Sequence, residues 1–237
     1  MQIFKFIKYG IYMLFVRLKG IKFKHIYKTK GEEEAFKYGQ EVFRKWSEFT
    51  IKMTGMNIEV KGYENIPKET CTFIGNHKSI LDIPVLKHAS KRDVGFIAKK
   101  EVLKIPVLGF WVANMNCVAL DRSNPRDAIK VIAKGVDYLK KGHNMAIFPE
   151  GTRSKDGEVH EFKKGSMKLA VKAKAPIVPF SIDGTSKCFE DNRKFIPGKV
   201  TIVFGKPIYT ASLTKEEEKS LTEKVRNEVI KNMIKVD

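Results

Sequence analysis

The chain has 237 residues and a formal net charge of +18, and hydrophobic residues make up 43% of it. That length suits one α/β domain with a short extra element, and the composition excludes an intrinsically disordered chain. The positive charge indicates an acidic partner, which is nucleic acid, an anionic lipid surface or an acidic protein. Three widely spaced cysteines, Cys71, Cys117 and Cys188, show neither zinc spacing nor a disulfide framework, so we expect a reducing compartment.

Residues 1–24 predict a helix that lies in a membrane interface. Their longest charge-free run, residues 9–16, is much shorter than the roughly 20 apolar residues of a transmembrane helix. Apolar side chains cover most of the helix, and lysines beside such a surface can snorkel to lipid headgroups. The alternative is a helix that docks on the domain with solvated lysines. One stripe of the helix is mainly basic and consists of Lys5, Lys8, Tyr12, Phe15, Lys19 and Lys22.

Residues 31–55 predict a second amphipathic helix that ends at Gly55. Its apolar stripe, which includes Phe43 and Trp46, favours core packing over membrane contact. We therefore expect two regions. Residues 1–56 form an amphipathic helical pair that anchors the protein at a membrane interface, and residues 57–237 form an α/β domain.

From residue 57 onward, short apolar runs alternate with helical stretches. Alternation of this kind predicts an α/β fold with a largely parallel central sheet flanked by helices. Helices are expected over 125–142, after Asn124-Pro125, and over 215–235, after a capping box of Thr214 and Glu217. The expected strands are Ile58–Lys61, Cys71–Gly75, Val94–Ala98, Cys117–Leu120, Met145–Phe148, Ile177–Ile182 and Lys199–Phe204.

His77 and Asp82 follow the expected strand that ends at Gly75, and Asp82 is placed to cap the helix that begins near Pro84. On one straight helix, side chains five residues apart would diverge, whereas a turn between them lets them converge. Asp82 would then fix the tautomer of His77 and leave the other ring nitrogen free to accept a proton. No G-x-S-x-G nucleophile motif is present, so a general base here indicates a substrate hydroxyl as nucleophile. An H-x-x-x-x-D pair taken alone is more often structural.

A second segment, residues 148–154, ends another expected strand and reads Phe-Pro-Glu-Gly-Thr-Arg-Ser. Backbone N–H groups near Gly151 and Thr152, together with the Arg153 fork, suit a phosphate. Glu150 is expected to position Arg153 or a substrate hydroxyl. The alternative is an ordinary turn with a solvated arginine.

Together these segments resemble the glycerolipid acyltransferase family. Asn76, His77 and Asp82 resemble its first block, Asp121-Arg122 the second, residues 148–154 the third, and Ile177-Val178-Pro179-Phe180 the fourth. The order and the intervals match across residues 71–184. Within the family, the chain is most similar to the 1-acyl-glycerol-3-phosphate acyltransferases.

The resemblance implies that an acyl chain moves from acyl-CoA or acyl carrier protein to the 2-hydroxyl of lysophosphatidate, giving phosphatidate. It implies that His77 is the general base and that Asp82 orients it. Arg153, Gly151 and Thr152 would hold the acceptor phosphate, with Lys99 as a second cation. Arg122 would either face the substrate or be a surface charge. The acyl chain would occupy an apolar groove lined by residues such as Phe110 and Trp111.

We expect no metal and no cofactor besides the acyl donor. Expected partners are an anionic phospholipid surface, lysophosphatidate, and acyl-CoA or acyl carrier protein. The expected place is the cytoplasmic face of the cell membrane, as a peripheral or monotopic protein. Glycerol-3-phosphate or another lysophospholipid remains open as the acceptor. A non-catalytic lipid-binding protein and a nucleic-acid-binding protein are the rival classes, but nucleic acid is not expected because no recognised binding motif is present.

Overall fold

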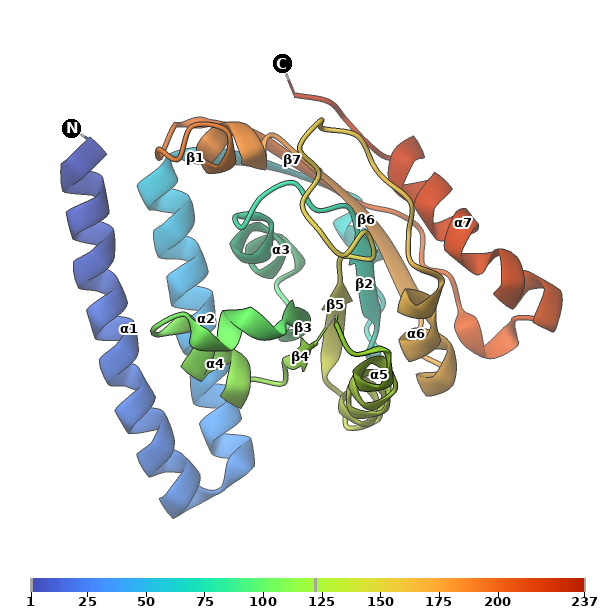
Figure 1. The fold of residues 1–237 in the computed structure, drawn as a ribbon, viewed down its shortest axis with the longest axis horizontal. Coiled ribbons are helices and arrows are strands. Elements are labelled where there is room, and N and C mark those ends of the chain that lie inside the picture. The colour runs from blue at the N-terminus through green and yellow to red at the C-terminus, as the bar shows by residue number, and fades with distance from the viewer. Residues whose placement is uncertain (1, 122, 237) are drawn as a thin grey trace.

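A seven-stranded sheet forms the centre of the computed structural model, which describes residues 2–121 and 123–236 (Figure 1). The strand order is β1-β7-β6-β2-β5-β3-β4; β6 and β7 pair antiparallel, and the other paired strands run parallel. All seven expected strands are present, with ends shifted by at most two residues, and the α/β prediction is confirmed. The strands are β1 (Met56–Lys61), β2 (Thr72–Gly75), β3 (Val94–Lys99), β4 (Val118–Leu120), β5 (Asn144–Ile147), β6 (Ile177–Asp183) and β7 (Gly198–Phe204).

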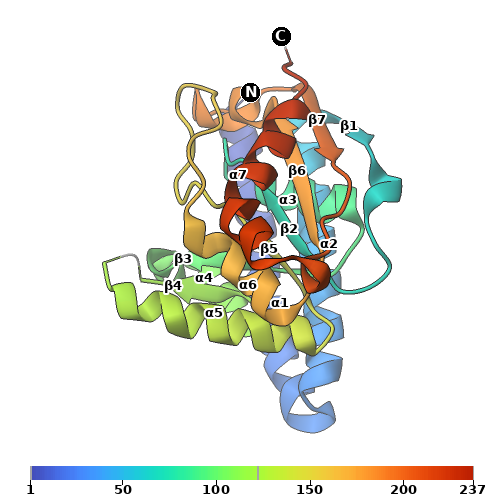
Figure 2. The same cartoon turned by 90° about the vertical axis from the view of Figure 1, so that its right-hand side faces the viewer.

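Helices cover both faces of the sheet because successive side chains of a strand point to opposite faces. In β2, Phe73 packs in a cluster with residues of α3 (Asp82–Ser90). The next residue, Ile74, packs in a separate cluster with α6 (Lys168–Ala173) and α7 (Lys215–Lys231). Helix α5 (Pro125–Lys140) lies on the same side as α6 (Figures 1 and 2).

Helices α1 (Gln2–Lys30) and α2 (Glu32–Thr54) form a long antiparallel hairpin beside the α3 face of the sheet (Figure 1). The left-handed conformation of Gly55 ends α2, as expected. A glycine is needed at position 20, because a Cβ there would lie 2.9 Å from the ring of Phe110 in α4 (Leu108–Asn114). This close approach lets α4 pack against the hairpin.

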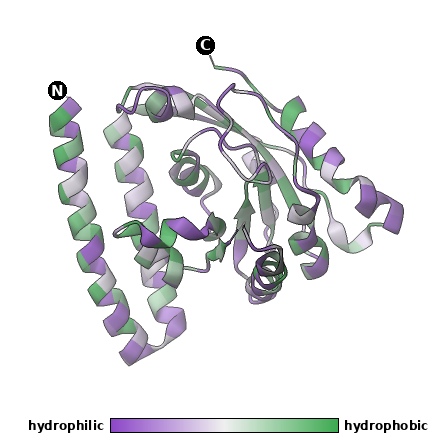
Figure 3. Ribbon diagram, in the orientation of Figure 1, coloured by the Kyte–Doolittle hydropathy of each residue, from purple (hydrophilic) through white to green (hydrophobic). Residues whose placement is uncertain are grey.

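One face of α1 is buried on the rest of the protein, and the opposite face is apolar and exposed. Figure 3 shows hydrophobic and hydrophilic residues interspersed along the whole helix. The expected basic stripe needs a correction at Lys5, which lies on the packed side and donates from Nζ to the carbonyl oxygen of Phe195 at 3.1 Å. None of the helices within residues 2–121 and 123–236 is long and apolar enough to cross a membrane. The exposed apolar residues of α1 are Ile3, Phe4, Phe6, Ile7, Ile11, Leu14, Phe15, Leu18, Ile21 and Tyr27.

The capping box of Thr214 and Glu217 opens α7 as predicted. The helix ends at Lys231, four residues earlier than expected. The chain instead turns back over β6, where the carbonyl oxygen of Asn232 accepts a hydrogen bond from Ser181 Oγ at 2.8 Å. The last described residue, Val236, donates its N–H to Asp183 Oδ2 at 2.7 Å.

Candidate active site

Loops from neighbouring parallel strands meet at one edge of the sheet. His77 follows β2, Glu150 follows β5, and Lys99 is the last residue of β3. Strands β2, β5 and β3 are adjacent and parallel, so their carboxyl ends lie side by side. This edge is where open α/β sheets place ligands. The topology therefore explains why segments more than 70 residues apart contribute to one site.

The turn after β2 brings His77 and Asp82 into contact. His77 Nδ1 lies 2.7 Å from Asp82 Oδ2, so the predicted convergence of the two side chains is confirmed. The expected capping role of Asp82 is wrong, because Leu81 precedes the helix and Asp82 is its first residue. Its carboxylate turns back toward His77 instead.

Four donors hold the fully buried Asp82 carboxylate. Besides His77, the backbone N–H groups of Lys78 and Ser79 donate to Oδ2 at 2.7 and 2.9 Å. The hydroxyl of Thr185 donates to Oδ1 at 2.6 Å. A carboxylate held in this way fixes the imidazole with its proton on Nδ1. Nε2 then carries the free lone pair.

The ring and backbone of His77 are also held by the loop after β5. The imidazole stacks on Phe148 with ring centroids 4.1 Å apart. Glu150 accepts hydrogen bonds from the backbone N–H of His77 at 2.8 Å and of His160 at 3.2 Å. Burial raises the pKa of Glu150. Glu150 therefore holds the turn that carries His77, and Arg153 pairs with Glu190 rather than with Glu150.

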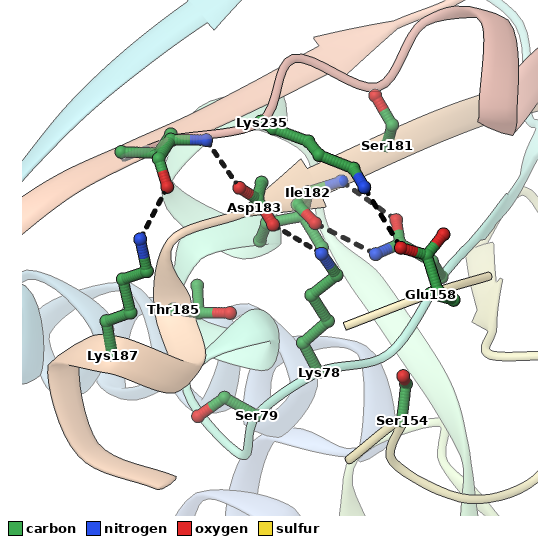
Figure 4. A network of polar contacts seen from close by, with 12 residues as sticks. Lys78, Ser79, Ser154, Glu158, Ser181, Ile182, Asp183, Thr185, Lys187 and Lys235 are labelled. Atoms are coloured by element: carbon green, nitrogen blue, oxygen red, sulfur yellow. Dashed lines mark hydrogen bonds and ion pairs between the residues drawn. The ribbon is translucent and has the colours of Figure 1, made fainter. Parts of the chain in front are cut away.

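A buried ion pair fixes the same turn from the other side. Lys78 pairs with Asp183 at the end of β6, and both residues are buried (Figure 4). Asp183 also accepts the N–H of Val236, and Lys235 of the returning chain pairs with Glu158 at 2.9 Å. The returning chain thus ties β6 to the loop that follows β5.

His77 lines a cavity of about 470 Å³ between the helical hairpin and the sheet. Of the residues expected to bind substrate, Lys99, Gly151, Thr152 and Arg153 line the same cavity. Trp111 lines it as expected, whereas Phe110 packs edge-on against Phe23. Most of the wall is apolar and comes from both the hairpin and the sheet side; it includes Met13, Val16, Val42, Phe43, Trp46, Phe96, Val112 and Met115.

Two of the residues that line this cavity are cations, Lys99 and Arg153. Arg153 is partly exposed and forms an ion pair with Glu190, a partner that sequence reasoning did not identify. Lys99 is half exposed, and its Nζ lies 3.4 Å from Glu101. Arg122 lies outside the described residues.

Lys163 is a further cation that the sequence analysis missed. Gly151 has φ +76, and a Cβ built on it would lie 2.8 Å from the Lys163 ammonium. The side chain of Lys163 therefore lies directly over the glycine turn. Nothing in the sequence distinguishes Lys163 from the many other lysines. It lies beside Gly151 only because the loop folds back, with the Lys163 N–H bonded to the carbonyl oxygen of Pro149.

The cysteine of the cavity wall is not an activated nucleophile. Cys117 lines the cavity, and burial raises the pKa of its thiol to about 11. Burial likewise raises the pKa of Cys71 to about 12. Because the thiolate is the reactive form, both thiols are inert near neutral pH.

The fold and the site define an α/β protein in which a histidine paired with a buried aspartate lines a mostly apolar cavity that also contains cations. Residues 57–183 match the Acyltransferase family model. The chain belongs to this acyltransferase family.

Its relatives include 1-acyl-sn-glycerol-3-phosphate acyltransferases. The chloroplastic enzyme of Brassica napus is 34% identical over 74% of this chain, which spans only 50% of that protein. The Borreliella burgdorferi protein is 30% identical over 78% of this chain and 74% of its own. The crystal structure of the 1-acyl-sn-glycerophosphate acyltransferase PlsC of Thermotoga maritima has a TM-score of 0.71 and 30% identity, covering 94% of this chain and 97% of that one.

Proposed function

We propose that this chain transfers a fatty acyl group from a thioester to the 2-hydroxyl of 1-acyl-glycerol-3-phosphate, which yields phosphatidate. The observation that carries the proposal is the contact between His77 and Asp82 at a mostly apolar cavity whose wall also contains Lys99 and Arg153. The activity printed for the relatives supports the same acceptor.

His77 serves as the general base in this reaction. Nε2 takes the proton of the acceptor hydroxyl, and the oxygen attacks the thioester carbonyl carbon. As the tetrahedral intermediate collapses, the carbon–sulfur bond breaks and the thiolate leaves with the proton from the imidazolium. Asp82 stabilises the imidazolium that exists between these two steps. General-base help of this kind is worth about 10²–10⁴ in rate.

The acceptor phosphate binds at the cationic end of the cavity. Arg153 offers a planar fork that matches phosphate, and Lys99 and Lys163 add point charges. Gly151 and Thr152 offer backbone N–H groups on the same loop. Lys163 lies over Gly151, so its ammonium is close to the loop that carries Arg153 two residues later.

The helical hairpin, residues 1–56, anchors the protein at an anionic membrane surface. The exposed apolar face of α1 enters the interface, while neighbouring lysines contact headgroups. Met13 and Val16 of α1 line the cavity that reaches His77. The same helix therefore contributes an exposed apolar face to the interface and apolar side chains to the proposed acyl-chain cavity. The protein acts as a peripheral or monotopic protein on the cytoplasmic face of the cell membrane.

The acyl donor is acyl-CoA or acyl carrier protein, and both are acidic partners that suit a chain of net charge +18. No cofactor besides this donor is required, because the base and the thioester supply the chemistry.

An acceptor panel tests the proposal. Purified protein on anionic vesicles is given each donor with lysophosphatidate, glycerol-3-phosphate, lysophosphatidylcholine or 1-acylglycerol, and the products are identified by mass spectrometry. We expect phosphatidate as the main product, and an Arg153→Ala variant with a raised KM for lysophosphatidate. Equal use of 1-acylglycerol, which lacks the phosphate, would contradict the phosphate assignment.

A further inference from the structure

Glu190 connects the two loops that form the proposed site. It ends a π-helical turn, Ser186–Glu190, that follows β6. Its side chain is 15% exposed, although a glutamate is normally a surface residue. In sequence it is 37 residues from Arg153 and 110 from Ile80, so the fold alone brings these groups together.

The two carboxylate oxygens of Glu190 have different partners. Oε1 pairs with the Arg153 guanidinium through Nη1. Oε2 accepts hydrogen bonds from Ser79 Oγ at 3.3 Å and from the backbone N–H of Ile80 at 3.4 Å. Ser79 and Ile80 belong to the turn between His77 and Asp82. The guanidinium is therefore fixed relative to the general base through a single side chain.

We propose that Glu190 is a positioning residue that holds Arg153 ready to receive the acceptor phosphate beside His77. This inference rests on the proposed function. Only one terminal nitrogen of Arg153 is engaged by Glu190, and a guanidinium has five N–H donors, so the others remain for phosphate.

Preorganisation favours binding because an arginine of a flexible loop otherwise loses rotamer freedom when it binds a ligand. A second arginine limits the opposing effect, which is repulsion between the Glu190 carboxylate and the phosphate. Arg193 Nη1 lies 3.6 Å from the same carboxylate oxygen. Two arginines on one glutamate leave a net positive charge in this cluster.

The test compares Glu190→Gln and Glu190→Ala with wild type in steady-state assays on vesicles, with lysophosphatidate varied at saturating donor. A glutamine at position 190 keeps an oxygen that can accept the hydrogen bond from the Ile80 N–H, but it loses the negative charge that pairs with Arg153. We expect Glu190→Gln to raise the acceptor KM by about tenfold, the scale of one immobilised long side chain, with kcat within about threefold of wild type. Glu59→Gln is the matched control, because Glu59 pairs with Lys61 and Lys199 on the distant β1–β7 edge and should change neither constant.

A double-mutant cycle with Arg153→Ala separates positioning from general damage. In the Arg153→Ala background, Glu190→Gln should cause no further rise in KM. Thermal melting confirms that each variant is folded before its constants are compared. An unchanged or lowered KM in Glu190→Gln, or additive effects in the double variant, would overturn the inference. If wild type transfers no acyl group to lysophosphatidate, the proposed function itself fails, so the two failures are distinguishable.

Discussion

Asp82→Asn is the most informative perturbation of the proposed chemistry, because it changes one buried oxygen to an amide and keeps the shape of the side chain. The wild-type carboxylate accepts hydrogen bonds on both oxygens, from His77, Lys78 and Ser79 on one and from Thr185 on the other. An asparagine offers a single carbonyl oxygen to these donors. It also carries no charge to stabilise an imidazolium 2.7 Å away.

We expect kcat to fall by about 10²–10⁴, the range measured for loss of general-base assistance and of its orienting carboxylate. The acceptor KM should change little, because Asp82 is buried and does not line the cavity. Loss of acceptors for buried donors should also lower the free energy of unfolding by about 1–3 kcal/mol. Initial rates with labelled acyl donor and a thermal melt of each variant measure these quantities.

Asp156→Asn is the matched control. Asp156 Oδ1 lies 3.0 Å from His160 Nε2, so it forms a second His–Asp pair, but on the exposed surface. The kcat of Asp156→Asn should equal that of wild type within about twofold, since exposed ion pairs contribute little to stability. A folded Asp82→Asn enzyme with kcat within about threefold of wild type would refute the reasoning.

Three further predictions concern other parts of the site and the hairpin. Lys163→Ala should raise the acceptor KM by about tenfold or more, the value of one charged hydrogen bond, and an unchanged KM would remove Lys163 from the phosphate site. Cys117→Ala should keep kcat within about twofold of wild type. Alkylation of Cys117 at pH 8 should be slow, because at a pKa of about 11 only about one thiol in a thousand is ionised. The alkylation rate should rise with pH up to about that pKa. A variant with asparagine at three exposed apolar positions of α1 should bind anionic vesicles at least about tenfold more weakly in a sedimentation assay, whereas Ile129→Asn on α5 should bind like wild type. Equal vesicle binding by the triple variant and by Ile129→Asn would contradict the interface assignment. The three positions are Phe4, Leu14 and Ile21.

Sequence reasoning predicted the features that depend on local pattern. The seven strands follow from short apolar runs, and the His77–Asp82 contact follows from a turn between a strand end and a helix start. Both signals lie within a few residues of the chain. The capping role of Asp82 was wrong because the same carboxylate can serve either the helix or the preceding turn. Here it binds three donors in the turn and a fourth, the hydroxyl of Thr185.

Long-range contacts of the site had no sequence signal. Glu190 and Thr185 follow β6, which lies beside β2 in the sheet, whereas Lys163 comes back to Gly151 from later in the same loop. Glu150 was expected to position Arg153 or a substrate hydroxyl, and in the structure its carboxylate accepts hydrogen bonds from the backbone N–H groups of His77 and His160. The N-terminal helix was expected to lie in a membrane interface, with docking on the domain as the alternative. Its two faces differ, with one packed on α2 and one exposed and apolar.

The central claim is that His77 activates the acceptor hydroxyl for direct attack on the thioester. The most direct test measures phosphatidate formed from lysophosphatidate and each acyl donor by wild type and by a folded His77→Ala variant. We expect wild type to form phosphatidate acylated at the 2-position, and His77→Ala to form it at a rate lower by about 10²–10⁴. Undiminished phosphatidate formation by His77→Ala would contradict it.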